Sequence, residues 1–239
     1  MNLAVDYGNS RIKAGLFENH HLVEHVQFES DPQFEAWLGA HRFEHVIISS
    51  VTRDTDHILQ VIKCDGAKLV MSQSILLPLT IKYATPLTLG VDRIAAACGA
   101  IEIMPNRDCL VIDMGTCINY EFVDDQLNYH GGAISPGVKM RFDAMHTFTA
   151  RLPLIHLNDK VALTGNSTET CMQSGVMNGV LSELEGIIAL YREKYPSMGV
   201  ILCGGDAHIF ENKLKQPIFV APNLVLRGLN SIMLHNVNF

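Results

Sequence analysis

The feature that most constrains the fold is a motif that occurs twice: an apolar run that ends near an aspartate and passes directly into a glycine turn. The first copy is Asn2–Tyr7, with Asp6, and the second is Cys109–Met114, with Asp113. The two aspartates are 107 positions apart (113 − 6), which is close to half of the 239 residues. This spacing predicts that the chain contains two structural repeats.

Each copy of the motif is followed by two more segments with strand character. Arg11–Phe17 and Leu22–Phe28 follow the first copy, and Cys117–Val123 and Gln126–Ile134 follow the second. Alternating apolar and polar residues separated by polar turns are typical of hairpin strands. Both halves are therefore expected to begin with three successive strands.

The rest of the chain alternates short apolar runs with helical patterns, which is typical of an α/β fold. We predict two domains, residues 1–107 and 108–239. Asp31 is expected to cap a helix that has Pro32 at its first position. The other predicted elements are the buried strands His45–Ser50 and Gly199–Cys203, and helices at Gln33–Leu38, Thr52–Ile62, 90–104, Thr168–Lys194 and Val225–Leu234.

Composition excludes several classes of function. The chain is 48% hydrophobic and 18% charged, and it carries a net charge of −7, which does not favour nucleic acid or an anionic membrane as a partner. No apolar run reaches the roughly 18 to 20 residues that span a bilayer, and the N-terminus lacks the pattern of an export signal. We therefore expect a cytoplasmic protein. Its six cysteines form no Cys-x-x-Cys pair and are predicted to be buried reduced thiols, and its eleven histidines are predicted at the surface.

The repeated motif suits phosphate chemistry. Glycine lets the backbone approach a phosphate closely, the N–H groups of the turn act as donors, and the aspartate can hold a hydrated cation. A single Asp-x-Gly is most often only a hairpin turn. Two copies in a repeat, together with a third glycine turn at Gly204-Gly205 after a buried strand, indicate a site for a nucleotide's phosphates.

The most distinctive stretch runs from Tyr83 to Arg93. Asp92 and Arg93 stand side by side at the start of a predicted helix. One interpretation is structural: a capping aspartate followed by a solvated arginine. The functional alternative makes Asp92 a general base on a substrate hydroxyl, with Arg93 and the N–H groups of the helix start holding an anionic group.

The arrangement of three glycine turns resembles the acetate kinase, sugar kinase, heat-shock-70 and actin superfamily. The resemblance implies an α/β fold of two duplicated ribonuclease H-like domains with a nucleotide cleft between them, with the later Gly-Gly turn near adenosine. Other nucleotide folds fit poorly, because the chain has neither Gly-x-x-x-x-Gly-Lys-Ser/Thr nor a strand-associated Gly-x-Gly-x-x-Gly.

Longer motifs narrow the resemblance to the type III pantothenate kinases, and they cover nearly the whole chain. That family phosphorylates pantothenate with ATP in the first committed step of coenzyme A synthesis. The matching motifs are Asp6-Tyr-Gly-Asn-Ser10, the Tyr83 to Arg93 segment, Asp113-Met-Gly-Thr116, Gly131-Gly-Ala-Ile-Ser-Pro136-Gly137, Thr149-Ala-Arg-Leu-Pro153, Gly165-Asn-Ser-Thr168, Gln173-Ser-Gly175 and Gly204-Gly-Asp-Ala207.

The resemblance also implies a role for individual residues. Asp92 becomes the catalytic base, and Asp113 is assigned to a monovalent cation, K⁺ or NH₄⁺, which the family needs as well as Mg²⁺. ATP is assigned to Asp6, Tyr7, Gly8, Asn9, Ser10, Arg11, Ile12, Lys13 and Thr116, and pantothenate to Tyr83, Gly90, Val91, Asp92, Arg93 and Thr168. The family further implies a homodimer.

Two positions depart from the family pattern. Asn119 and Glu121 stand where the second hairpin of the family commonly has Thr and Asp. The extra methylene of Glu moves its carboxylate by more than about 1 Å, so cation affinity or dimer contacts are expected to differ. Lys13 also has a second interpretation, that of a solvated lysine at a strand edge.

Two other functions share the predicted fold. One is a hydrolase of polyphosphate or of a guanosine phosphate, which places water where the substrate hydroxyl lies. The other is a non-catalytic regulator that binds a metabolite or a protein. Neither requires the Tyr83 to Arg93 segment together with Asp92 as a general base, so the sequence favours the kinase.

Overall fold

A mixed β-sheet forms around the strand that contains Asp6 in the computed structural model of this chain, which describes residues 1–8, 11–50, 55–158 and 160–237. Its strands are β1 (Asn2–Tyr7), β2 (Ile12–Glu18), β3 (His21–Phe28), β4 (Val46–Ser50) and β5 (Lys68–Val70). They lie in the order β3-β2-β1-β4-β5. β1 is antiparallel to β2 and parallel to β4, so the ends of β1 and β4 that carry Asp6 and Ser49 point the same way.

A second sheet repeats this order around the strand that contains Asp113. Its strands are β6 (Thr80–Ile81), β7 (Cys109–Met114), β8 (Cys117–Val123), β9 (Asn128–Pro136), β10 (Gly199–Cys203) and β11 (Phe219–Val220). They lie in the order β11-β10-β7-β8-β9-β6, with β7 parallel to β10. Apart from β6, each strand has a counterpart in the first sheet, so the predicted α/β fold with a duplicated sheet is confirmed.

With its helices, the chain divides into two compact units. The helices are α1 (Asp31–Gly39), α2 (Asp56–Val61), the 3₁₀ turn η1 (Pro86–Thr88), α3 (Val91–Ile103), α4 (Val138–Thr147), α5 (Thr168–Lys194), α6 (Ala207–Phe210) and α7 (Leu224–Val237). The first unit holds residues 1–106 and 123–130 and the chain from Asn223 on; the second holds residues 107–122 and 131–222. The division into domains at residue 107 stays a prediction.

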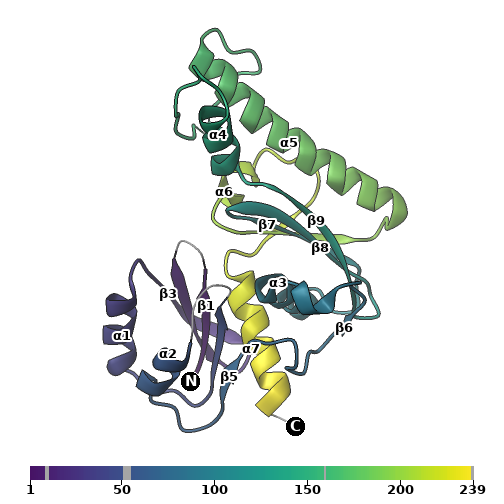
Figure 1. Cartoon of the computed structure of the whole chain (residues 1–239). Coiled ribbons are helices and arrows are strands. Elements are labelled where there is room, and N and C mark those ends of the chain that lie inside the picture. The colour runs from purple at the N-terminus through teal and green to yellow at the C-terminus, as the bar shows by residue number, and fades with distance from the viewer. Residues whose placement is uncertain (9–10, 51–54, 159, 238–239) are drawn as a thin grey trace. The chain divides into compact units, whose positions relative to one another are not determined.

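In the first unit, β1 alternates its side chains between two cores. Leu3, Val5 and Tyr7 belong to the core that includes residues of α1 and α2, whereas Ala4 packs in the core with α3 and α7. Figure 1 shows α1 and α2 on one side of this sheet and α7 on the other. Because side chains alternate along a strand, Asp6 shares the α3 and α7 face with Ala4.

The close crossing of α3 and α7 depends on glycine. A Cβ atom on Gly228 would lie 1.7 Å from the carbonyl oxygen of Ala95, and one on Gly99 would lie 2.4 Å from that of Leu224. The two helix backbones therefore approach each other more closely than any side chain allows. This crossing fixes α3, the helix whose first turn carries Asp92.

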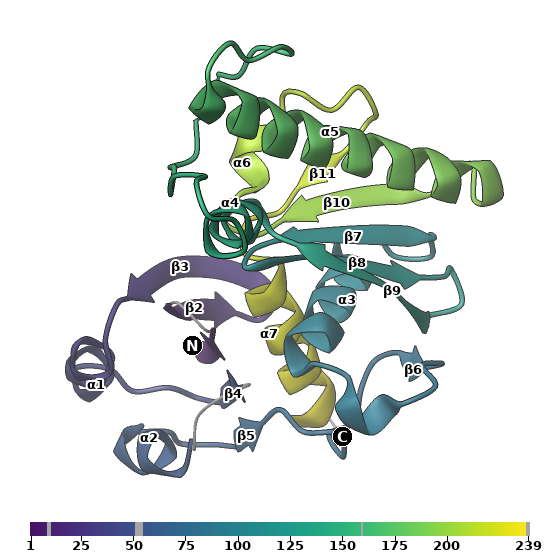
Figure 2. The same cartoon turned by 45° about the horizontal axis from the view of Figure 1, so that its top comes forward.

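In the second unit, α5 covers one face of the sheet. Figure 2 shows α5 running along β10 and β7. Its residues Val180, Leu184 and Ile188 are completely buried in the core of this unit. The predicted helical stripe and the predicted bounds of this helix are confirmed.

Some local predictions are wrong. Ser30, not Asp31, is the N-cap of α1, so Pro32 lies one position further into the helix than expected. Cys171 is exposed, although Cys98, Cys109 and Cys203 are buried and all six cysteines are free thiols. The eleven histidines are exposed or half-buried, as predicted. No helix in the described ranges is both long enough and apolar enough to cross a bilayer.

Candidate active site

The first aspartate–glycine turn closes as the motif predicts. The N–H of Gly8 donates to the carbonyl of Arg11 at 3.2 Å, and Asp6, which is 9% exposed, lies opposite Lys13 in the β1–β2 register. The side chains of Tyr7 and Ile12 are buried in the core beside α1, so only their backbone is available to a ligand. The predicted residues Asn9 and Ser10 lie outside the described residues.

The second turn is tied to the start of α4. The N–H of Gly115 donates to the carbonyl of Cys117 at 2.9 Å, and the N–H of Gly137 donates to the carbonyl of Thr116 at 3.1 Å. A Cβ atom on Gly137 would lie 2.3 Å from the carbonyl oxygen of Gly115. The Pro136-Gly137 motif therefore packs directly against the turn that carries Thr116, whose side chain is exposed.

The third glycine turn packs against Asp113. Gly204 has φ +90, and a Cβ atom there would lie 2.5 Å from Asp113 Oδ1. The N–H of Asp206 donates to the carbonyl of Met114 at 3.0 Å. Within the second unit, the structure therefore brings together the second and third glycine turns around one carboxylate, a grouping that the sequence could only suggest by analogy.

The donor set around Asp113 fits a cation that prefers oxygen. The carboxylate of Asp113 and the nearby main-chain carbonyl of Met114 are oxygen donors of the kind that such cations take. In the described part of the chain, no cluster of three or more His, Cys, Asp and Glu side chains could hold a metal. A bound cation would therefore take a carboxylate as one ligand and backbone, water or phosphate oxygens as the others, as Mg²⁺ commonly does beside nucleotides.

The start of α3 gathers the predicted pantothenate residues of the first unit. Gly90 is the N-cap, and a Cβ atom there would lie 2.5 Å from Asp92 Oδ1, so glycine leaves room for that carboxylate. Arg93 is 9% exposed, and its Cζ lies 5.8 Å from the centroid of the Tyr83 ring. The interpretation of a capping aspartate followed by a solvated arginine is therefore wrong.

The ring of Tyr83 packs against a second tyrosine, Tyr129. Its ring centroid lies 6.3 Å from that of Tyr129, which is completely buried at the start of β9. An arginine over an aromatic face is attracted to the negative face of the ring. Arg93 is thus stacked on a tyrosine that is anchored in the core, which keeps its guanidinium in a fixed place.

Thr168 is the first residue of α5 in the second unit. Ser167 is the N-cap: its hydroxyl accepts from the N–H of Thr170 at 3.2 Å, and the N–H of Ser167 donates to Thr170 Oγ1 at 2.9 Å. Thr168 lines a cavity of about 870 Å³ together with residues of α4 and α5, among them Arg141 and Met172.

Near the second turn lies a polar network that the sequence does not predict. Tyr120 Oη donates to Glu183 at 2.8 Å, and Arg141 pairs with the same carboxylate and also donates to the carbonyl of Pro136 at 2.8 Å. Burial raises the pKa of Glu183, but hydrogen bonds from Arg141, Tyr120 and Ser135 outweigh that effect and lower it. The network fixes α4 to α5, and no local pattern signals it because its members are far apart in sequence.

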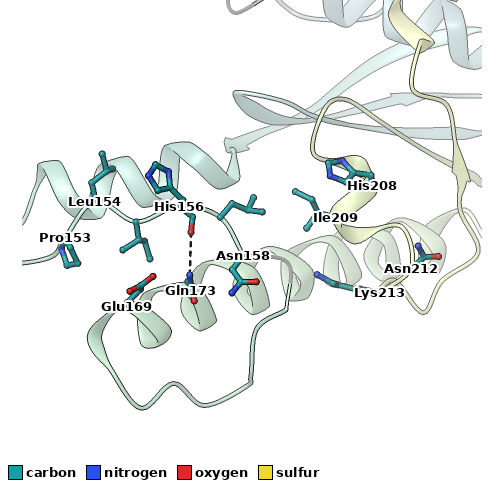
Figure 3. Close-up of a pocket in the computed structure, with 12 residues that line it drawn as sticks. Pro153, Leu154, His156, Asn158, Glu169, Gln173, His208, Ile209, Asn212 and Lys213 are labelled. Carbon is teal, nitrogen blue, oxygen red and sulfur yellow. Dashed lines mark hydrogen bonds between the residues drawn. The ribbon is translucent and has the colours of Figure 1, made fainter.

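A second cavity of about 790 Å³ lies beside the third glycine turn. His208 Nδ1 is 2.8 Å from the carbonyl oxygen of Gly205, and Gln173 Nε2 donates to the carbonyl of His156 at 3.5 Å. Figure 3 shows the residues of α6 on one side of this cavity and those of the 153–158 segment and α5 on the other. Its lining is mixed, with imidazole, amide and charged groups among aliphatic ones.

Known proteins match this chain over nearly its whole length. A family model for the type III pantothenate kinases matches residues 2–190. A type III pantothenate kinase of Cytophaga hutchinsonii is 41% identical over 237 residues, which is 99% of this chain and 100% of that protein. One of Bacteroides fragilis is 42% identical over 240 residues, which covers 99% and 98%.

Solved structures with low identity share the fold. A Campylobacter jejuni protein of the Baf family of transcriptional activators has a TM-score of 0.67 at 20% identity, covering 99% of this chain and 100% of that one. A glucokinase from an Antarctic psychrotroph has a TM-score of 0.53 at 10% identity, covering 98% of both chains. At these identities, the two structures support the fold alone.

Proposed function

Because this chain belongs to the type III pantothenate kinases, and so phosphorylates pantothenate with ATP in coenzyme A synthesis, we propose that Asp92 is the general base of that reaction. The observation that carries the assignment is the first turn of α3, where a buried arginine stacked on Tyr83 follows Asp92 directly. The residues assigned to pantothenate are Tyr83, Gly90, Val91, Asp92, Arg93 and Thr168.

Asp92 would act on the primary hydroxyl of pantothenate. As that oxygen attacks the γ-phosphate in line, Asp92 accepts its proton late in the transfer. The N–H groups of the first turn of α3 and the guanidinium of Arg93 orient an anionic group of the substrate. The start of α3 thus supplies both the proposed base and groups that orient the substrate.

ATP is assigned to the two aspartate–glycine turns, through Asp6–Lys13 in one and Thr116 in the other. The backbone N–H groups of these turns are suited to phosphate oxygens. The 790 Å³ cavity beside Gly204-Gly205 is our candidate for the nucleoside, because its imidazole and amide groups can hydrogen-bond to a base or a ribose.

Two cations complete the proposed site. Asp6 would hold hydrated Mg²⁺ and Asp113 a monovalent cation, K⁺ or NH₄⁺. When bound, these cations neutralise charge that builds on the phosphates. The chain itself supplies the two carboxylates and, beside Asp113, the main-chain carbonyl of Met114 at the Gly204 turn.

Asp92→Asn tests the assignment of the base. The amide keeps the shape of the side chain but cannot accept the proton, so turnover should fall by a factor of about 10² to 10⁴, with ATP binding largely kept. Turnover is measured by a coupled assay, and ATP affinity by calorimetry. Asp65→Asn, which alters an exposed aspartate paired with Arg42, is the matched control and should leave turnover unchanged. Native turnover in Asp92→Asn would overturn the assignment.

The same assay separates the kinase from its two rivals. ATP cleavage that requires pantothenate supports the kinase. Cleavage at the same rate without pantothenate would indicate a hydrolase, and absence of cleavage would indicate a regulator. The match to the Baf family protein concerns the fold alone, because the two chains are only 20% identical.

A homodimer in the cytoplasm is also part of the proposal. Large apolar side chains are exposed on the second unit, with Phe148 84%, Leu163 83% and Ile134 62% accessible. Association with a second copy of the chain would remove apolar side chains of this kind from water. Sedimentation equilibrium should give twice the chain mass, and a monomer at micromolar concentration would contradict this part of the proposal.

A further inference from the structure

Ser49 lies beside Asp6 in the first sheet. β4 runs parallel to β1, and Ser49 is the register partner of Asp6. Ile47 and Ala4, two residues earlier on each strand, both pack in the core with α3 and α7. The two-residue alternation of strands therefore directs the side chains of Ser49 and Asp6 to the same face.

The second observation concerns the hydrogen bonding of the Ser49 hydroxyl. Ser49 is 1% exposed, and its Oγ has no hydrogen-bond partner within the described ranges. A buried hydroxyl that lacks a partner costs free energy, because it has given up its bonds to water. Such an atom in a native protein calls for an explanation, and one explanation is a partner that is present only in the working state.

Asp6 is the nearest side chain in register that offers an acceptor. Neighbouring strands lie about 4.8 Å apart, a distance that a serine hydroxyl and an aspartate carboxylate can bridge when both turn toward each other. The residues that precede them on the same face, Ala4 and Ile47, offer no side-chain acceptor. The pair lies near the carboxyl ends of the parallel strands β1 and β4, and ligands of α/β proteins bind outside such strand ends.

We infer that Ser49 is a positioning residue for Asp6, whose hydroxyl donates to the Asp6 carboxylate when Mg²⁺–ATP is bound. This inference rests on the proposed role of Asp6 at the phosphates. A carboxylate has two oxygens, and a donor on one of them fixes its rotation and leaves the other for a hydrated cation. Ser49 touches neither the nucleotide nor pantothenate in this role, and it acts only through Asp6.

The test is Ser49→Ala. The variant should lower kcat/KM for Mg²⁺–ATP about tenfold and raise the Mg²⁺ concentration that gives half-maximal rate, with KM for pantothenate unchanged. The melting temperature of the ligand-free protein should stay the same or rise, since the unpaired hydroxyl is removed. A purely structural serine would show the reverse pattern, a lower melting temperature with unaltered Mg²⁺ dependence.

Ser174→Ala is the matched control. Ser174 is also buried, but its hydroxyl donates to the carbonyl of Leu163 at 2.6 Å. Its removal should lower the melting temperature and leave the Mg²⁺ dependence as in the wild type. Ser49→Thr keeps a hydroxyl at the strand position and should restore most of the Mg²⁺ response.

Asp6→Asn distinguishes failure of this inference from failure of the proposed function. In the Asp6→Asn background, Ser49→Ala should cost less than twofold further, because Ser49 acts through the carboxylate. If Ser49→Ala alone keeps wild-type kcat/KM and Mg²⁺ dependence while Asp6→Asn is impaired, the role of Ser49 is wrong and that of Asp6 stands. If Asp6→Asn is as active as the wild type, the proposed phosphate site itself is wrong.

Discussion

At Gly204, both the backbone conformation and the neighbouring atoms require glycine. Its φ of +90 is one that L side chains rarely adopt, and its missing Cβ leaves room for both Asp113 Oδ1 and the carbonyl of Met114. A side chain there must displace the carboxylate that we assign to the monovalent cation. The neighbouring Gly205 has nothing within 4 Å of an added Cβ, so the two glycines form a natural pair for comparison.

Gly204→Ala should therefore harm both stability and the cation response. Backbone strain and the contact with Asp113 should lower the free energy of unfolding by about 1–3 kcal/mol and weaken activation by K⁺. Gly205→Ala should change stability by less than about 0.5 kcal/mol. Urea unfolding and rate measurements across a K⁺ series check both variants, and equal behaviour of the two would contradict a tight fit at Gly204.

The sequence singles out individual residues where a motif repeats. The duplicated pattern pointed to Asp6, Asp113 and the three glycine turns; the structure has these turns, and the roles of the two aspartates at the phosphates stay predictions. Ser49 was not predicted, because a serine that closes a buried strand becomes informative only when the register places it beside Asp6. The burial of Arg93 was missed for a similar reason, since Tyr83 lies ten positions earlier and their contact depends on the turn between them.

Among the elements, the crossing of α3 and α7 is the contact that positions Asp92. Gly228 meets the carbonyl of Ala95 so closely that a Cβ atom would overlap it. Overpacking at such a contact forces the helices apart. Because α3 carries Asp92 in its first turn, any shift of the helix also displaces the proposed base.

Gly228→Ala should destabilise the protein by about 1–3 kcal/mol and raise KM for pantothenate. The matched change is Gly186→Ala on α5, where an added Cβ has nothing within 4 Å; it should stabilise by about 0.5–1 kcal/mol, the usual gain in helix propensity. Thermal unfolding and steady-state kinetics measure both. A harmless Gly228→Ala would show that the helices can separate at no cost.

Helices and strands with a strong sequence pattern were predicted accurately, and those with a weak pattern were not. The bounds of β1, β7, β8, β10 and α5 were predicted to the residue, because each has a clear apolar run or helical stripe. α4 was missed, since only Val138 and Phe142 of its ten residues are buried and its polar face dominates the pattern. β5, β6 and β11 have two or three residues each, too few for any periodicity to appear.

For the whole molecule, the cation requirement is the broadest consequence of the proposed site. Phosphorylation of pantothenate should be measured in K⁺, NH₄⁺ and Na⁺ salts at equal ionic strength and fixed Mg²⁺. We expect turnover in the first two salts and little in the third, because the Asp113 site is assigned to the larger cations. Equal rates in Na⁺ would remove the monovalent cation from the proposal.

Asp113→Asn serves as the companion variant in the same salts. Loss of the carboxylate charge should shift half-maximal activation to higher K⁺, with KM for pantothenate little changed, since the substrate residues of α3 belong to the other unit. A variant that responds to K⁺ as the wild type does would place the cation elsewhere.

The position of α7 has a consequence for how the protein is made. The first unit contains the earliest residues of the chain, yet its core on one face is completed by Leu226, Leu229 and Ile232, which a ribosome adds more than two hundred residues later. The second unit lies between them in sequence and needs none of these residues for its own core. During synthesis, Ala4 and Ile47 can therefore pack against residues of α3 at first, and this core is complete only once α7 has been made.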